Sequence, residues 1–525
     1  MGYTDFRIIS INNKLSPDNQ YFSLFYSIDE GPRYKLGNVS MDTNFIGDKF
    51  EEMNKLLTIK TQVIYNRNMA HANANAIKEF LLEHGYPEII VTFEEIKSTN
   101  DRVIDLKFQI KRAEKIFVGK INITGNIKTE DNLIRKYISV CEGDFFNAVA
   151  LNIAKQNLTL LNYFSSVQIS SAQNSKNTNA IDVNIKVVEK STMDTTFKAG
   201  YGTQSGFYGA ANLSEINLFG TGKKINMMIM KSQNGLNVGA DFINSELFGR
   251  NIRNGISTLI GSNQSLPLNY TEDSKSISIF GSYNIFNNLT HEISYGLKSS
   301  DVTMGLNNSK STTLDLQNFY TSSIKNQISY DKLDNPNSPK NGYLVSLSQQ
   351  TAGLGGDNKF FKFESTGTLI KSFMRNNVTL SASFNAAIIK PLGSQDDIKI
   401  MDRFVLGDYE FRGFEYGGIG PRQTQNGDSK AIGGLQYYVL TLDLKFPLGI
   451  PEEMGVDGHL FVDAGSIWGV NDNSQNITNN TNAMRASVGF GISLNKMVPI
   501  RIDFAIPISK QSQDKEQVIS FRMGY

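Results

Sequence analysis

From about residue 191 onward, apolar and polar residues alternate in short runs, and this alternation constrains the fold more than any other feature of the chain. A period of two places successive side chains on opposite faces of a β-strand, so each run predicts a strand with one apolar and one polar face. The clearest runs carry apolar residues at Ile225, Met227 and Ile229; Ile277 and Ile279; Leu440, Leu442, Leu444 and Phe446; Ile502, Phe504 and Ile506; and Ile519, Phe521, Met523 and Tyr525.

The length of this region predicts a closed barrel. Roughly 335 residues, at about 20 per strand and connection, allow about 16 strands of membrane-spanning length. We therefore predict a transmembrane antiparallel β-barrel over residues 191–525, with its apolar residues facing lipid and its polar residues facing the lumen. A soluble β-sandwich is the alternative. It explains the final run less well, because an aromatic end such as Tyr525 suits a membrane interface.

Three Asn-Gly pairs in this region favour tight hairpin turns, since both residues tolerate positive φ. They are Asn234-Gly235, Asn254-Gly255 and Asn341-Gly342. We expect a turn between two strands at each pair.

The first third of the chain contains a repeat with a period of about 80 residues. Paired alternating runs at Phe22–Met41 and Ile104–Ile123 resemble each other, and Ile181–Glu189 begins a third copy. The order within a copy is β-α-α-β-β, with domains predicted at 32–113 and 114–190. Residues 1–31 would supply the last two strands of a preceding copy, so we expect the sequence to begin inside a domain.

The copy at 114–190 shows this order most clearly. A strand is predicted as far as Thr124 and a helix from Thr129 through Ile138, followed by a second helix with one apolar face. That face carries Leu151, Ala154, Leu158 and Leu161. A small sheet covered on one face leaves a strand edge open, and such an edge can accept an extended peptide. A plain spacer is the alternative.

Composition excludes several classes of function. The formal net charge of +1 indicates no basic surface for binding nucleic acid. The mean hydropathy is -0.27, and no run of about 18 apolar residues exists, so the sequence predicts no transmembrane helix. The single cysteine, Cys141, and four scattered histidines predict no metal site and no cofactor. We find no Gly-x-Ser-x-Gly elbow, P-loop or His-Glu-x-x-His motif, so we expect no enzyme activity.

One segment combines a permanent charge with aromatic and glycine residues. In Met401–Arg422, Arg412 stands between aromatic neighbours, and Phe461–Gly465 places Asp463 in an apolar, strand-like run. Arginine cannot shed its charge, so an ordered Arg412 needs carboxylates or carbonyls around it. A solvated loop arginine is the alternative.

These segments, in this order, resemble the BamA family of bacterial outer-membrane β-barrel assembly factors. In that family, periplasmic POTRA domains precede a 16-stranded barrel. The repeats resemble POTRA domains, with boundary segments at Gly2–Phe6 and Glu30–Tyr34. The barrel motifs that carry the resemblance are Asn217–Gly222, Gly353–Asp357, Phe411–Phe414, Gly417–Arg422 and Phe461–Gly465. The family commonly has five POTRA domains, so the resemblance implies that this chain is truncated at its N-terminal end.

The resemblance also implies roles for individual residues. Phe411, Arg412, Gly413 and Phe414 would form the tip of a loop folded back into the lumen. Arg412 would meet Asp463 on the lumen wall, with Asp443 as a second acidic partner and with Phe461 and Gly465 beside them. The first strand, at Thr192–Tyr201, and the last, at Val518–Tyr525, would pair weakly and open sideways. The residues expected at this lateral seam are Lys198, Gly200, Gly202, Phe521 and Tyr525.

The implied function is insertion and folding of β-barrel proteins in the bacterial outer membrane, with the POTRA domains in the periplasm. The implied partners are unfolded barrel clients, accessory outer-membrane lipoproteins and the lipid bilayer. A related POTRA-barrel transporter that secretes one partner protein is the alternative. A related translocation-and-assembly factor with three POTRA domains fits the visible number of repeats. A passive porin is the rival from another class, and the POTRA-like array argues against it.

Overall fold

The structure is a computed structural model. It describes residues 2–15, 22–41, 50–57, 61–84, 86, 89–98, 100–111, 116–304, 316–336, 338–374, 377–393, 398–425, 428–470, 477–496 and 498–524. The chain divides into two compact units, Met1–Thr192 and Met193–Tyr525. Each unit is described by itself.

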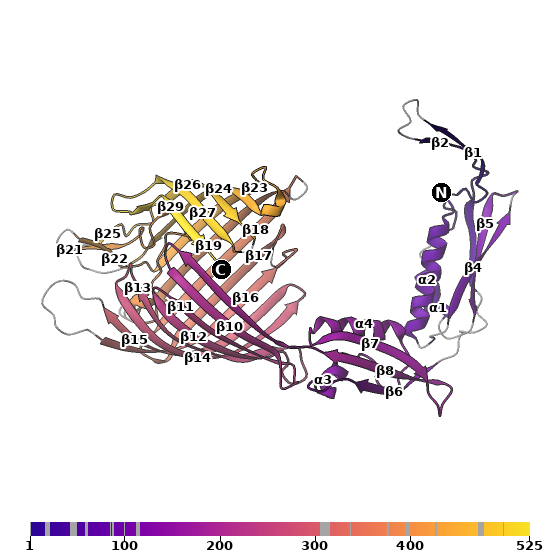
Figure 1. The fold of residues 1–525 in the computed structure, drawn as a ribbon, viewed down its shortest axis with the longest axis horizontal. Coiled ribbons are helices and arrows are strands. Elements are labelled where there is room, and N and C mark those ends of the chain that lie inside the picture. Colours follow the sequence, from indigo (N-terminus) through magenta and orange to yellow (C-terminus); the bar gives the residue numbers. More distant parts are fainter. Residues whose placement is uncertain are drawn as a thin grey trace. The chain divides into compact units, whose positions relative to one another are not determined.

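The first unit contains a hairpin and two copies of one α+β fold (Figure 1). The strand order is β3-β5-β4 in one copy and β6-β8-β7 in the other, so the predicted β-α-α-β-β order is confirmed. The hairpin consists of β1 (Arg7–Leu15) and β2 (Phe22–Asp29). The first copy contains β3 (Lys35–Met41), α1 (Phe50–Leu56), α2 (Arg67–Glu83), β4 (Ile90–Ser98) and β5 (Val103–Lys111). The second contains β6 (Phe117–Thr124), α3 (Asp131–Lys136), α4 (Ala148–Leu160), β7 (Phe164–Gln173) and β8 (Ala180–Glu189).

Both copies contain the same irregularity in their first strand. The register of β3 on β5 shifts after Leu36, and that of β6 on β8 shifts after Val118. At each shift an aspartate of the central strand accepts a backbone N–H: Asp105 from Asn38 at 2.6 Å and Asp182 from Lys120 at 2.8 Å. The bond from Lys120 holds the pKa of Asp182 below its usual value. The neighbouring residue is glycine in both copies, because a Cβ there would collide with the carboxylate.

The helix predicted from Thr129 through Ile138 is shorter than expected, since α3 covers only Asp131–Lys136. The backbone N–H groups of Lys128 and Thr129 donate to the carboxylate of Glu189, which fixes the chain before the helix begins. In α4, the predicted face is buried at Leu151, Ala154 and Leu158.

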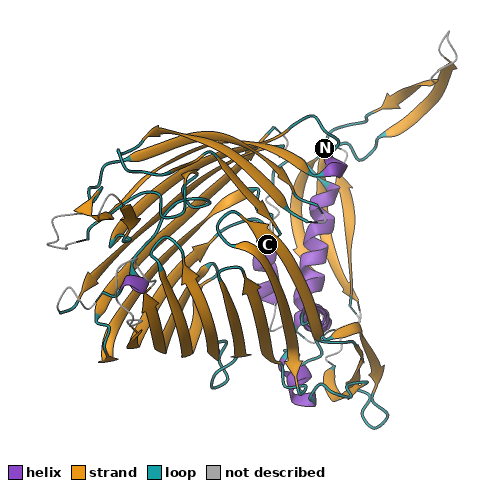
Figure 2. Ribbon diagram, turned by 60° about the vertical axis from the view of Figure 1, so that its left-hand side comes forward, coloured by secondary structure: helices purple, strands orange, loops and turns teal. Residues whose placement is uncertain are grey.

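The second unit is a closed barrel of 16 antiparallel strands, which confirms the predicted barrel and rules out the sandwich. Figure 2 shows these strands as one curved wall with loop segments on its inner side. The strands are β9 (Met193–Gly202), β10 (Gly206–Leu218), β11 (Lys223–Ser232), β12 (Gly235–Asn244), β13 (Arg253–Ser265), β14 (Tyr270–Phe286), β15 (Leu289–Met304), β16 (Leu316–Asp331), β17 (Asn341–Gly356), β18 (Phe360–Phe373), β19 (Val378–Pro391), β23 (Gln436–Pro447), β24 (Val456–Trp468), β26 (Arg485–Leu494), β27 (Ile500–Ser509) and β29 (Ile519–Met523).

The two faces of the wall follow the sequence alternation. Leu440 and Leu442 are 48% and 53% exposed, as lipid-facing residues are when the lipid is absent. Asp443 lies between Leu442 and Leu444 on the opposite face, where its side chain is only 12% exposed. The inner face at this point is therefore filled by protein.

Only one of the three predicted Asn-Gly turns is correct. Asn234-Gly235 joins β11 to β12, whereas Asn254-Gly255 lies inside β13 and Asn341-Gly342 begins β17. At Gly255 a Cβ would stand 2.3 Å from the carbonyl oxygen of Phe242, so glycine there permits close approach of a neighbouring strand. Before β17, Asp334 accepts the backbone N–H groups of Lys340 and Asn341 and closes the connection without an Asn-Gly bend.

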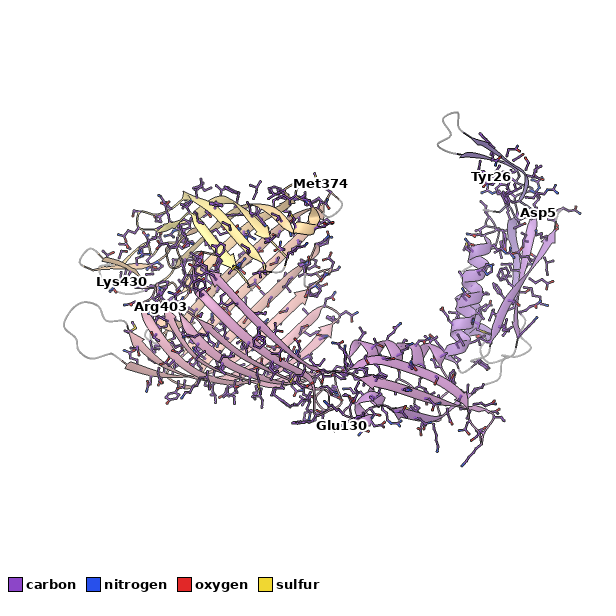
Figure 3. All side chains as sticks on the ribbon, in the orientation of Figure 1. Asp5, Tyr26, Glu130, Met374, Arg403 and Lys430 are labelled. Carbon is purple, nitrogen blue, oxygen red and sulfur yellow. The ribbon has the colours of Figure 1, made fainter. Side chains whose placement is uncertain are left out.

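A long connection between β19 and β23 contains short elements of its own. These are η3 (Ile400–Asp402), β20 (Gly413–Phe414), β21 (Arg422–Gln425) and β22 (Asp428–Ala431). β20 pairs with β28 (Glu516–Gln517), and β21 pairs with β25 (Ile477–Thr478); η4 (Glu452–Met454) precedes β24. Figure 3 places Met374, in the turn after β18, at one end of the barrel and Arg403 and Lys430 at the other. Among the described helices, none has the length and apolar character needed to cross a membrane.

Candidate functional site

Arg412 is the centre of the contacts between the long connection and the barrel wall. It lies immediately before β20 and is 6% exposed. Its Nε and Nη2 atoms donate to the two carboxylate oxygens of Asp463 on β24, both at 2.8 Å, and its backbone N–H donates to the same carboxylate at 3.1 Å. Its Nη1 atom donates to Asp443 on β23 at 3.1 Å. This bidentate, charge-assisted geometry fixes both the position and the orientation of the guanidinium group.

Aromatic side chains enclose the same arginine. Its guanidinium carbon lies 3.4 Å from the centroid of the Phe461 ring, a cation–π contact in a desolvated site. Phe411 and Phe414 are fully buried and pack edge to face, with their centroids 5.3 Å apart. Gly465 leaves room for this packing, because a Cβ there would stand 3.0 Å from the Phe411 ring and 2.2 Å from a carbonyl oxygen. The aromatic residues therefore hold the tip against β24.

Gly413 completes the tip. Its φ of +91° is unfavourable for residues with a side chain, and an added Cβ would lie 3.0 Å from Ser487. The Ser487 hydroxyl on β26 donates to the carbonyl oxygen of Arg412 at 2.5 Å. The tip is thus bound to β23, β24 and β26.

Asp443 connects this tip to further buried charges. Besides Arg412, it accepts from Arg501 Nη2 on β27 at 2.8 Å and contacts His459 Nδ1 at 2.8 Å. Arg501 also pairs with Asp503 at 2.8 Å, and the Thr441 hydroxyl donates to Asp463. Three carboxylates thus share two guanidinium groups and a histidine. Removing one member of such a buried network leaves its partners without a counter-charge.

The barrel closes where β29 meets β9, and this junction is short. In the described part of both strands, paired positions are Arg522 with Gly202 and Met523 with Tyr201. By contrast, β9 pairs with β10 along its whole length, from Gly202 opposite Gly206 to Met193 opposite Glu215. Among the described residues, the pairing of β9 with β29 is therefore confined to the end of β9 at Tyr201 and Gly202.

The structure brings together some of the predicted seam residues and separates others. Gly200 and Gly202 lie at the junction, and the rings of Phe521 and Tyr201 are 5.9 Å apart. Lys198 lies opposite Ala210 of β10, beyond the positions that pair with β29. Tyr525 lies outside the described residues.

Gly200 and Gly202 were expected at the seam. In the structure, a Cβ at Gly200 would stand 2.1 Å from the carbonyl oxygen of Met523, and one at Gly202 would stand 2.6 Å from the Tyr409 hydroxyl. Both glycines permit close approach of groups from elsewhere in the barrel.

The barrel region matches the model of a known protein family. The family model for the Omp85 superfamily domain matches residues 217–525, which is more than half of the chain. The chain belongs to the Omp85 superfamily. A second model, POTRA (surface antigen variable number repeat), matches residues 116–190, where the structure has the second β-α-α-β-β copy.

Curated relatives and solved structures extend the superfamily assignment. The outer membrane protein assembly factor BamA of Neorickettsia risticii is 26% identical over 99% of this chain and 69% of its own length. BamA of Neisseria meningitidis serogroup B is 25% identical over 100% of this chain and 70% of its own length. The crystal structure of Haemophilus ducreyi BamA lacking POTRA domains 1–3 matches with a TM-score of 0.81 at 19% identity, over 94% of this chain and 99% of that one. This last likeness shows the shared fold.

The sequence did not lead us to predict that two further arginines of this Omp85 barrel, Arg422 and Arg485, are buried and paired. Arg422 is 2% exposed and donates to the carbonyl oxygens of Gly417 and Ser429, both at 3.0 Å. Arg485 and Asp514 form an ion pair at 3.1 Å with both side chains fully buried. The glycine-rich motif that ends in Arg422 was a signal for the first. No local pattern relates Arg485 to Asp514, because 29 residues separate them.

Among the described residues, no group of three or more His, Cys, Asp or Glu side chains could hold a metal ion. The polar groups around Arg412 are paired with one another, which suits mechanical anchoring.

Proposed function

We propose that this chain is an outer-membrane assembly factor that inserts and folds β-barrel proteins through a lateral seam between β9 and β29. The observation that carries the proposal is the β9–β29 junction, which pairs at two positions among the described residues, whereas every other junction of the barrel pairs at five or more. The curated relatives named assembly factor BamA match it over nearly the whole chain. The barrel lies in the bacterial outer membrane and the POTRA domains lie in the periplasm.

The mechanism follows from the cost of unpaired backbone groups in lipid. Opening the junction exposes N–H and C=O groups of β9 that water cannot satisfy within the bilayer. An incoming client strand satisfies them by adding to this edge, and further client strands add to the first. Client folding supplies the free energy, and the client leaves when its own edges close.

The repeats act as docking sites in this proposal. The domain limits are 1–31 for the end of one POTRA domain, 32–113 and 114–190 for two further domains, and 191–525 for the barrel. The open strand edges of the two sheets, at β4 and β7, bind extended segments of clients by strand addition. Accessory outer-membrane lipoproteins are further partners.

The tip around Arg412 keeps the barrel in shape while the seam opens. It ties β23, β24 and β26 to the long connection through charged hydrogen bonds. We assign this role to Phe411, Arg412, Gly413 and Phe414, with Asp443, Phe461, Asp463 and Gly465 as their wall partners. Around the seam, Lys198, Gly200, Gly202, Phe521 and Tyr525 belong to the segments that separate.

A disulfide across the seam tests the function. Tyr201→Cys and Met523→Cys place cysteines at directly opposed positions, within the reach of a disulfide, in a Cys141→Ser background because Cys141 is exposed. Insertion of a client barrel into liposomes is then measured for the oxidised and reduced forms. We expect oxidation to stop insertion and reduction to restore it.

A matched lock in the wall provides the control. Ile279→Cys and Tyr295→Cys occupy directly opposed positions on β14 and β15. Oxidation of this pair should leave client insertion unchanged. Equal insertion by the seam-locked and reduced proteins would show that clients do not enter through this junction. Secretion of a chain without insertion would favour the transporter.

A further inference from the structure

We propose that Tyr409 is a latch that couples the long β19–β23 connection to the seam and competes with the client strand for the edge of β9. The inference rests on the proposed function and adds a residue that positions the seam strands. Tyr409 is three residues before Arg412, so the latch and the wall anchor belong to one short segment.

The Tyr409 hydroxyl bridges the two strands that must separate. It donates to the carbonyl oxygen of Phe521 on β29 at 2.7 Å and accepts the backbone N–H of Thr203, the residue after β9, at 2.8 Å. Thr203 and Phe521 also bond each other, through Thr203 N–H to the Phe521 carbonyl at 3.0 Å and Phe521 N–H to the Thr203 hydroxyl at 2.8 Å. The hydroxyl therefore sits at the end of the short backbone ladder and extends it with a side chain.

Two features of the seam hold the Tyr409 ring in this position. The guanidinium carbon of Arg522, on β29, lies 4.9 Å from the ring centroid. Gly202 leaves the space for the hydroxyl, because a Cβ at that position would stand 2.6 Å from it. Each of the two seam strands thus contributes one residue to the Tyr409 site: Gly202 of β9 leaves space for the hydroxyl, and Arg522 of β29 contacts the ring.

The segment around Tyr409 also holds the residues just before β29. β20 pairs with β28, with Gly413 opposite Gln517 and Phe414 opposite Glu516. The Gln517 side chain donates to Asp408 at 2.9 Å. One side of this segment is therefore bound to the rigid wall through Arg412, and its other side is bound to the strand that moves.

The latch has a direct chemical consequence for client entry. A client strand that adds to β9 at this level needs the Thr203 N–H as a donor to its own carbonyl oxygen. In the closed seam that N–H already faces the Phe521 carbonyl and the Tyr409 hydroxyl. Release of Tyr409 removes one acceptor from the Thr203 N–H and one donor from the Phe521 carbonyl, so separation of β9 from β29 and client pairing begin at the same point.

Tyr409→Phe removes the hydroxyl and keeps the ring against Arg522. The readout is backbone amide exchange of segments 193–203 and 519–524, compared with the β14–β15 wall, in the full chain in liposomes. Loss of two hydrogen bonds at this position should raise the rate of amide exchange in the two seam segments about tenfold. The rate in β14 and β15 should not change. Tyr295→Phe is the control, since it removes a hydroxyl that bonds Ser322 at 2.9 Å, between β15 and β16. It should leave seam exchange unchanged.

A second variant approaches the latch from the opposite strand. Gly202→Ala displaces the hydroxyl without changing Tyr409, so it should also raise seam exchange. If both changes act on one contact, the double variant should exchange no faster than the faster single variant. Independent, multiplicative effects, or seam exchange in Tyr409→Phe equal to the unchanged protein, would overturn the latch.

Client insertion separates the latch from the function. Faster seam exchange in Tyr409→Phe, with no client insertion by either the variant or the unchanged protein, would leave the latch standing and remove the assembly function. Normal insertion with unchanged seam exchange would do the reverse. Insertion by Tyr409→Phe at a several-fold lower client concentration is the expected result, because the client no longer competes with the phenol.

Discussion

Two strand junctions of the barrel wall, β14–β15 and β9–β29, differ in what holds them together. β14 and β15 pair by backbone hydrogen bonds from Tyr270 opposite Met304 to Phe286 opposite Leu289. β9 and β29 pair, within the described residues, at two positions. Side chains of Thr203, Tyr208 and Tyr409 supply further hydrogen bonds at the second junction.

This difference determines which junction can be regulated. A backbone ladder is present whatever the side chains are, so single substitutions change it little. A junction held by side chains can be weakened or strengthened one residue at a time. It can also be reached from inside the barrel, since Tyr409 belongs to the segment that Arg412 fixes to the wall. The comparison predicts that changes in the Arg412–Tyr409 segment affect the seam more than β14 and β15.

Arg412→Ala should have the largest effect. It leaves Asp463 without its charged partner and Asp443 with one guanidinium fewer, in a site from which water is largely excluded. Breaking a buried pair in this way should lower the free energy of unfolding by about 3–5 kcal/mol. Urea unfolding followed by the fluorescence of Trp468, the only tryptophan in the sequence, measures the change.

The control for Arg412→Ala is Lys445→Ala. Lys445 pairs with Asp457 at 2.8 Å, but its side chain is 41% exposed, so its loss should cost less than about 1 kcal/mol. Arg412→Ala should also raise amide exchange at the seam more than at β14–β15. Equal increases at both junctions would mean that the loop supports the barrel generally and has no particular connection to the seam.

Gly200→Ala should have an intermediate effect, confined to the seam. The new Cβ would stand 2.1 Å from the carbonyl oxygen of Met523, so β29 must move away. Such overpacking costs about 1–3 kcal/mol. The rate of disulfide formation between Tyr201→Cys and Met523→Cys should fall accordingly in a Cys141→Ser background.

Gly281→Ala, in β14, tests whether the location of the glycine matters. Apart from its chain neighbours, no described heavy atom lies within 4 Å of the position its Cβ would take. It should leave both the disulfide rate at the seam and the stability of the barrel unchanged. A similar loss in both variants would show that the close approach at Gly200 is not what sets the fit of β29.

The barrel was predictable from sequence because its cause is local. Alternation requires only that neighbouring residues face lipid and lumen in turn. The faces that it predicted for Leu442 and Asp443 are those seen in the structure. The Asn-Gly pairs were less reliable. The same two residues permit a turn at Asn234-Gly235 and close packing of strands at Asn254-Gly255, and only the fold decides between them.

The site was predictable only where a resemblance supplied the long-range contacts. Arg412 and Asp463 are 51 residues apart, and their contact was expected from the family, since spacing alone gave no reason for it. Tyr409 lies in the same motif and was not singled out. Its partners, Thr203 and Phe521, lie 206 residues before it and 112 residues after it. A tyrosine in a loop shows its role only when both strand ends are in place around it.

Tyr208→Phe should have the smallest effect and gives the finest test of the comparison. The Tyr208 hydroxyl donates to the carbonyl oxygen of Met523 at 3.4 Å, a long hydrogen bond beside the two-position ladder. Its loss should change seam amide exchange by less than about twofold, compared with about tenfold for Tyr409→Phe. An equal effect of the two substitutions would mean that the seam is held by the sum of many weak side-chain contacts. A much smaller effect at Tyr208 would place control of the seam at the point where the loop, β9 and β29 meet.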